Sequence, residues 1–410
     1  MDLRPTTCCT VRSQPDRHYA LYLVDKLNGK PKELLSSFPQ FIVTKCIMVV
    51  VSTPDMESAY RIFSVMNDRR LDLSHADILK AEIIGAIDGE EQQETYGRRW
   101  EAVEDNLGRE AFEELFAHIR MIHVKQKMRG TILKEIRRFV EPATQPTAFV
   151  EEQLEPYADA LKTIKSAGYQ STQGAETINM YLGWLNRVDN VDWIPPAILA
   201  LAQHESDSRW LGRFFQQLER LAAGLLVMRA GINDRLERYS KLLSALQNGQ
   251  DVLAPPSDLY LTDEERAKIV KGLDGDLYEM TKVRAYVLLR LDHALSGGGA
   301  VYDYPIITIE HVLPQTPPNG SKWFEWFPDE KERTGWVHRI GNLVLLSRKK
   351  NGEAQNFEFD TKKEKYFKSD KGISPFVLTT QVLVETEWTP VRLKARQEAL
   401  VAKLKEVWSL

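Results

Sequence analysis

The chain has 410 residues, of which 43% are hydrophobic and 27% are charged, and its formal net charge is −4 at pH 7. This length predicts two or three domains, and the composition is that of an ordinary globular protein. The slightly negative charge argues against a protein that coats nucleic acid non-specifically, but an enzyme with a local basic groove stays open.

The sequence contains no features of a membrane or secreted protein. It has no run of about 18 apolar residues that could span a bilayer. Residues 1–20 lack the apolar segment of a signal peptide. The three cysteines, Cys8, Cys9 and Cys46, are too few for a disulfide framework or a zinc set. We therefore expect a cytoplasmic protein with no membrane partner.

The N-terminal part is predicted to contain one strand and two helices. Residues 41–52, FIVTKCIMVVVS, are rich in β-branched side chains and predict one strand. Residues 55–66 then predict a helix with apolar side chains on one face. Ser74 and Asp77 have the spacing of a capping box and predict the start of a second helix that ends near Ala86.

Residues 91–295 have an almost wholly helical pattern. Large apolar side chains recur at helical spacing, as in Trp210, Phe214, Leu218, Leu221 and Leu225. The segment SGGGA at 296–300 is the clearest linker of the chain. We therefore predict three parts: an N-terminal part at 1–90, a helical middle domain at 91–295 and a C-terminal domain at 300–410.

The C-terminal domain carries the clearest candidate for a chemical site. An apolar strand ends in Glu310-His311, and a second strand, LVLL, follows the turn HRIGN and leads into a basic stretch ending at Asn351. An acidic residue and His on a first strand, with Asn on the last element, is the layout of a ββα-metal nuclease.

Phosphodiester hydrolysis needs the residue types found here. A neutral imidazole accepts a proton from water near neutral pH, and His311 is placed for that role. A divalent ion such as Mg²⁺ or Mn²⁺ takes oxygen ligands, which Glu310 and Asn351 would supply. Asn342, which follows Gly341 in the turn, could fix the loop beside His311.

Several spaced motifs extend this pattern over residues 300–410, namely IEHVLPQ, HRIGNLVLL, RKKNGEAQNF, KKEKY and SPFVLT. They resemble the C-terminal HNH domain of GmrSD-type restriction endonucleases, the type IV enzymes that depend on DNA modification. The resemblance implies that His311 is the general base and that Glu310 and Asn351 are metal ligands. It also implies that Asn342 fixes a loop and that His338 contacts the scissile phosphate.

The N-terminal part resembles the same family less completely. Residues 58–84 are similar to the segment after the family's nucleotide-binding core, but Arg70 stands where the family has glycine. The family's D-G-Q-Q-R motif and a phosphate-binding P-loop are both missing. We therefore expect residues 1–90 to be a truncated remnant of the regulatory domain and assign no nucleotide cofactor. A homodimer or a partner subunit that supplies the missing function stays open.

Four lysines flank the candidate site, Lys349, Lys350, Lys362 and Lys363. They are expected to contact the DNA backbone, with a solvated face as the alternative. The expected fold is mainly α with small α/β parts, a helical middle and a C-terminal ββα-metal (HNH) nuclease domain. The expected function is metal-dependent cleavage or nicking of DNA in defence against phage. A non-catalytic DNA- or protein-binding subunit of a defence system is the alternative, and RNA is the other substrate considered.

Overall fold

The chain divides into two compact units, Met1–Leu73 and Ser74–Leu410. The computed structural model describes residues 30, 32–45, 74–302, 304–347, 356–368 and 374–410. In the first unit the described residues include helix α2 (Lys32–Lys45). The second unit contains every other element named below, and it is mainly helical, as predicted.

The strand predicted at 41–52 is wrong over its first five residues, because Phe41 to Lys45 belong to α2. A short apolar run rich in β-branched residues does not by itself distinguish a strand from the end of a helix. Residues 46–52 and the helix predicted at 55–66 lie outside the described residues.

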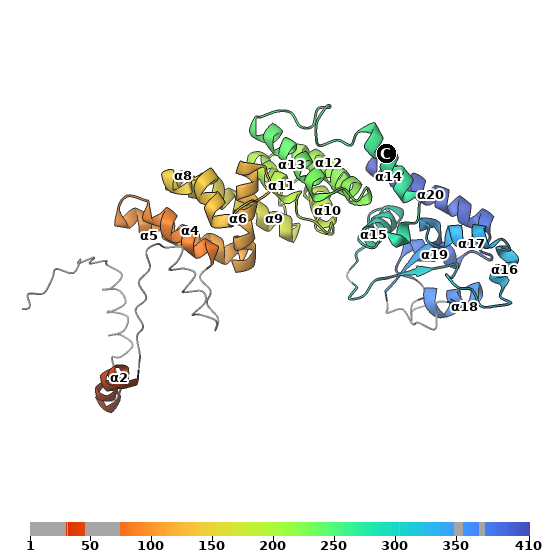
Figure 1. The fold of residues 1–410 in the computed structure, drawn as a ribbon, viewed down its shortest axis with the longest axis horizontal. Coiled ribbons are helices and arrows are strands. Elements are labelled where there is room, and N and C mark those ends of the chain that lie inside the picture. The colour runs from red at the N-terminus through yellow and green to blue at the C-terminus, as the bar shows by residue number, and fades with distance from the viewer. Residues whose placement is uncertain (1–29, 31, 46–73, 303, 348–355, 369–373) are drawn as a thin grey trace, which may run out of the picture. The chain divides into compact units, whose positions relative to one another are not determined.

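The second unit begins with a long series of helices (Figure 1). In chain order they are α4 (His75–Gly85), α5 (Glu90–Leu107), α6 (Arg109–Val124), α7 (Ile132–Glu135), η1 (Ile136–Val140), η2 (Pro142–Thr144), α8 (Pro146–Phe149), η3 (Val150–Leu154), α9 (Glu155–Ser166), α10 (Ala175–Leu185), α11 (Ile194–His204), α12 (Ser208–Val227), α13 (Ile232–Gln247), α14 (Asp263–Leu273), η4 (Leu277–Glu279) and α15 (Arg284–Leu295).

Helix α4 starts as its sequence predicts. The Ser74 hydroxyl accepts a hydrogen bond from the Asp77 backbone N–H at 3.1 Å, and the Asp77 carboxylate accepts one from the Ser74 N–H at 2.9 Å. This capping box satisfies two backbone donors that a helix start leaves without a partner. The helix ends at Gly85, next to the predicted end at Ala86.

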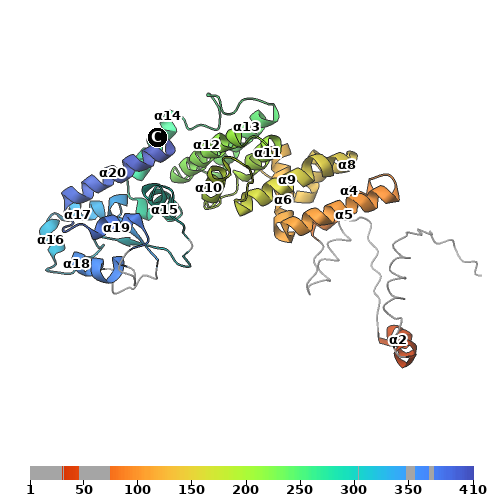
Figure 2. The same ribbon diagram turned by 180° about the vertical axis from the view of Figure 1, so that it is seen from behind.

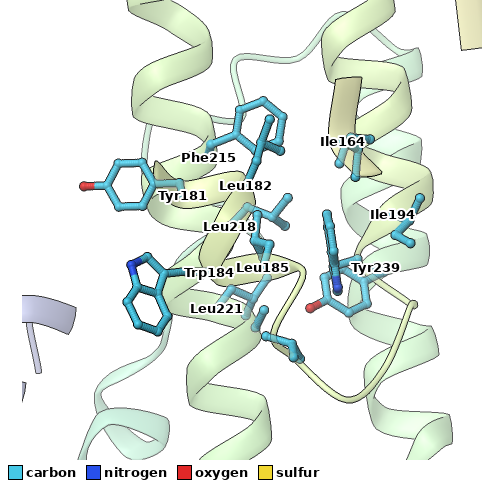
Figure 3. Packing of buried hydrophobic residues seen from close by; sticks show 14 of the residues in the cluster. Ile164, Tyr181, Leu182, Trp184, Leu185, Ile194, Phe215, Leu218, Leu221 and Tyr239 are labelled. Atoms are coloured by element: carbon cyan, nitrogen blue, oxygen red, sulfur yellow. The ribbon is translucent and has the colours of Figure 1, made fainter. Parts of the chain in front are cut away.

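The core of the helical part forms where helices turn their apolar faces toward one another. In α12 the side chains of Phe214, Leu218 and Leu221 are fully buried, at the spacing that puts them on one helix face. Leu218 and Leu221 of α12 lie beside Leu182 and Leu185 of α10 (Figure 3). The helical spacing from Phe214 to Leu225 thus correctly predicted a core face.

The last part of the chain adds several short helices and the long helix α20 to a two-stranded sheet (Figures 1 and 2). In chain order the elements are β1 (Thr308–His311), α16 (Lys322–Trp326), α17 (Glu330–Val337), η5 (Ile340–Asn342), β2 (Leu343–Leu346), α18 (Phe359–Lys362), η7 (Lys363–Phe367), α19 (Val377–Leu383) and α20 (Pro390–Trp408).

A buried carboxylate links the helical part to the last helix. Glu219 of α12 is fully buried, and its Oε1 accepts hydrogen bonds from Tyr286 and Arg290 of α15 and from Trp408 of α20. A buried carboxylate is stable only when such donors surround it. This polar contact crosses the predicted boundary near residue 300, within the compact unit Ser74–Leu410. The three-part division therefore stays a prediction.

Over the part of the chain that the structure describes, no helix is both long enough and apolar enough to cross a bilayer.

Candidate functional site

The site lies at one end of an antiparallel hairpin. In β1 and β2, Thr308 pairs with Leu346 and His311 pairs with Leu343. All four residues of β2 are buried, so neighbouring groups cover both faces of this strand. Both strands agree with the sequence-based prediction, and the hairpin places Glu310 and His311 beside the turn that contains Asn342.

Asn342 holds the loops on both sides of this turn. Its side chain is fully buried and makes four hydrogen bonds. The Oδ1 atom accepts from the Leu313 N–H at 2.7 Å and from Trp388 Nε1–H at 3.2 Å. The Nδ2 atom donates to the carbonyls of Leu313 and Val337, each at 2.9 Å. These are the contacts that a loop-fixing residue requires, because every hydrogen-bonding position of the amide has a partner.

Helix α20 supports the same turn from the other side. The Gly341 N–H donates to Gln397 Oε1 at 2.7 Å, and Arg396 donates to the carbonyls of Gly341 and Leu343. A Cβ atom added at Gly341 would lie 3.0 to 3.1 Å from atoms of Gln397, so the close approach of helix and turn favours glycine here. Burial lowers the pKa of Arg396 to about 10.

Glu310 forms a buried ion pair. Its carboxylate Oε1 lies 3.3 Å from Lys362 Nζ, and the same ammonium donates to the His311 carbonyl at 2.6 Å. The side chains of Glu310 and Lys362 are 8% and 1% exposed. The prediction that Lys362 contacts the DNA backbone is therefore not supported, because a buried ammonium with two such partners does not face a surface where a phosphate could bind.

Of the other three lysines, Lys363 is the one that lies among the described residues. Lys363 is half-buried, and its ammonium donates to the Glu385 carbonyl and lies 5.0 Å from the ring centroid of Phe359. The structure thus does not bring Lys363 to the Glu310 side chain. Lys349 and Lys350 lie outside the described residues, as does the predicted metal ligand Asn351.

His311 is buried and contacts two side chains through its ring nitrogens. Its Nε2 lies 3.3 Å from Nδ1 of His338, which follows the end of α17, and its Nδ1 lies 3.3 Å from Nε2 of Gln315. The structure thus brings together His311 and His338, which the resemblance placed in one site. The two histidines are 27 residues apart in the sequence, and the turn that Asn342 fixes brings them together.

Sequence reasoning missed a group of residues that completes the site. The ring of Tyr278, in η4, lies 4.1 Å from the His311 ring and 5.5 Å from the His338 ring, measured between centroids. The Glu279 carboxylate lies 3.5 Å from His338 Nε2. Both residues precede the SGGGA linker and sit in a short polar segment with no recognisable motif. No local pattern could have identified them, because tertiary packing alone brings them to the histidines.

The described residues contain no group of three or more His, Cys, Asp and Glu side chains placed to hold a metal ion. The expected ligand pair of Glu310 and Asn351 would not form such a group, because it has one carboxylate and one amide. A cation at this position would therefore rely on few protein atoms and on water or phosphate oxygens.

The comparisons with known proteins agree with this location. No curated protein matches the chain significantly. The model of a family described as "GmrSD restriction endonucleases, C-terminal domain" matches residues 265–403. The match covers the hairpin, both histidines and also Tyr278 and Glu279, which the predicted domain at 300–410 leaves out. Residues 265–403 of this chain thus belong to the C-terminal domain family of the GmrSD restriction endonucleases.

Proposed function

We propose that this chain is a metal-dependent DNA endonuclease or nickase that acts in the restriction of foreign or phage DNA, with its reaction centre at Glu310, His311 and His338. The observation that carries the proposal is the hairpin geometry. One strand ends in a buried carboxylate and a buried imidazole, and the turn after the long loop brings a second imidazole within 3.3 Å of the first. We further propose that the C-terminal domain at 300–410 is a ββα-metal (HNH) nuclease domain.

His311 is the general base of the proposed reaction. Hydrolysis begins when a water molecule gives up a proton as it attacks phosphorus, and an imidazole held in place by other residues can take that proton. We assign the accepting lone pair of His311 to Nδ1, because this atom lies 3.3 Å from the Gln315 amide nitrogen, which is a hydrogen-bond donor. His338 is less buried and lies next to His311, where it can contact a phosphate oxygen.

The cation of the proposed reaction is a hard divalent ion such as Mg²⁺ or Mn²⁺. Glu310 and Asn351 would hold it, and both offer the oxygen atoms that these ions prefer. The bound cation would neutralise charge that develops on the scissile phosphate. The proposed roles of the described residues are separate from this one: His311 takes the proton, Asn342 fixes the loop, and Lys362 contacts Glu310 and the His311 carbonyl.

Cleavage of supercoiled plasmid tests the proposal. The wild-type chain should nick plain or modified plasmid with Mg²⁺ or Mn²⁺, and EDTA should abolish the reaction. Glu310→Gln keeps the size of the side chain but removes its charge, and it should lose the metal-dependent activity. If wild type and Glu310→Gln cleave equally, the activity comes from a contaminant and the proposed site is wrong.

A matched pair of DNA and RNA oligonucleotides in the same assay identifies the substrate. Faster cleavage of DNA supports the proposal, and faster cleavage of RNA would replace it with a ribonuclease. Absence of cleavage of every substrate with either metal, plain or modified, would favour a non-catalytic binding subunit.

A further inference from the structure

The segment from Leu277 to Arg284 packs on the two histidines of the proposed site. The backbone N–H of Tyr278 donates to the His338 carbonyl at 3.0 Å, and its ring is nearly parallel to the His338 ring, at 16°. Arg284 holds Tyr278 in turn, because its guanidinium donates to the Tyr278 carbonyl at 2.6 Å and lies 4.1 Å from the centre of the ring. Backbone and side-chain contacts thus fix Tyr278 against both imidazoles.

Four polar side chains form a row through the two histidines, in the order Glu279, His338, His311 and Gln315. Glu279 Oε1 lies 3.5 Å from His338 Nε2, and His338 Nδ1 lies 3.3 Å from His311 Nε2. His311 Nδ1 lies 3.3 Å from the Gln315 amide nitrogen. Each ring nitrogen of the two histidines therefore faces a polar group of another residue.

The residues at the two ends of this row, Glu279 and Gln315, determine which ring nitrogens donate hydrogen bonds and which accept them. A carboxylate only accepts hydrogen bonds, so the nearby Glu279 favours the tautomer of neutral His338 with its proton on Nε2, in which Nδ1 is an acceptor. His311 must then carry its proton on Nε2, which leaves a lone pair on Nδ1. The amide nitrogen of Gln315 only donates, and it faces that lone pair. One tautomer of each histidine satisfies all three contacts.

We propose that Glu279 and Tyr278 are positioning residues of the nuclease site. Glu279 sets the tautomer of His338 and, through it, the tautomer of His311, and Tyr278 holds the two rings in the orientation that the row requires. The consequence for the reaction rests on the proposed function: a general base must present a lone pair, and not an N–H, to the attacking water.

Glu279 contributes little to the stability of the fold. Its side chain is 64% exposed, so it buries little surface, and its replacement should leave the stability of the chain nearly unchanged. Any effect of Glu279 on the histidines would therefore be a local one. Glu398, an exposed carboxylate of α20, provides the matched control.

The tautomers can be measured without any activity. Long-range ¹⁵N–¹H NMR spectra of the full chain labelled with ¹⁵N-histidine, at about pH 8 where an ordinary imidazole is neutral, report which nitrogen carries the proton. Signals of His311 and His338 are assigned with single His→Gln variants. Both should be in the Nε2–H form in the wild type, and Glu279→Ala, unlike Glu398→Ala, should bring out the Nδ1–H form of His338. An Nδ1–H form of His338 in the wild type, or identical spectra of the two variants, would overturn the proposal.

Cleavage kinetics then test the consequence. Glu279→Ala should lower kcat about tenfold with little change in KM, the scale seen when a group that orients a functional side chain is lost. Glu279→Gln should recover most of the rate, because its amide oxygen can accept a hydrogen bond from His338 Nε2–H. Tyr278→Ala should also lower kcat, whereas Tyr96→Ala, the control for loss of a half-buried tyrosine, should not.

The two assays separate the two claims. Expected tautomers in a chain that cleaves nothing would remove the proposed function and keep the positioning of the histidines. An active enzyme whose kcat is unchanged in Glu279→Ala would keep the function and refute the positioning role.

Discussion

Replacement of Asn342 by alanine is expected to destabilise the loop that holds His311. The change removes four hydrogen bonds, to the N–H and the carbonyl of Leu313, to the carbonyl of Val337 and to Trp388. At about 1 kcal/mol net for each bond, the free energy of unfolding should fall by about 4 kcal/mol. The residue is fully buried, so solvent does not reach the groups left behind without local opening.

Urea unfolding of Asn342→Ala and of the control Asn233→Ala measures this loss. Asn233 is exposed in α13, and its replacement should change the free energy of unfolding by less than about 0.5 kcal/mol. Hydrogen exchange locates the effect, because the Leu313 amide should lose protection in Asn342→Ala while amides in α12 keep theirs.

A loss below about 1 kcal/mol, with Leu313 still protected, would refute this reasoning. It would mean that neighbouring groups or water replace the Asn342 amide easily, and that this residue does not fix the loop. Asn342→Asp provides a further check, because it keeps the acceptor and turns a second oxygen toward two carbonyls. This variant should be no more stable than Asn342→Ala.

Three further predictions concern other buried polar groups. Thr379→Val should cost about 2 kcal/mol in urea unfolding, because the Thr379 hydroxyl bonds both backbone groups of Leu345; a neutral result would contradict this. Lys362→Met should cost about 3 to 5 kcal/mol, because it removes the ammonium that faces the buried Glu310 carboxylate. Adding Glu310→Gln should restore most of the loss, and failure of that rescue would argue against the ion pair. Burial lowers the pKa of His118 to about 4, so the unfolded chain takes up the proton first and stability should fall from about pH 6.5 to 4, by about 3 kcal/mol, with no such fall in His118→Gln.

The sequence predicted those parts of the fold whose cause is local. Ser74 and Asp77 form the predicted capping box because both groups lie within one helical turn. The two strands of the hairpin are short apolar runs bounded by polar residues, and the structure has both. The strand predicted at 41–52 failed over residues 41–45, because an apolar run of that length suits the end of a helix equally well.

The site itself was predictable only in part. Glu310, His311, His338 and Asn342 belong to motifs, and the structure brings them into one region. The position of Lys362 was not predictable, because lysines are mostly exposed and its partner lies 52 residues away in the sequence. Tyr278 and Glu279 were missed for the same physical reason, since long-range packing and not spacing brings them to the histidines.

His311 performs the proton transfer of the proposed reaction, and single-turnover cleavage of a DNA duplex tests this role. The rate constant of His311→Ala is compared with those of the wild type and of His75→Ala, whose imidazole is exposed at the start of α4. His311→Ala should lose at least about a hundredfold in rate, the scale of a general base, and His75→Ala should keep the wild-type rate. A folded His311→Ala variant that cleaves as fast as the wild type would show that His311 is not the general base.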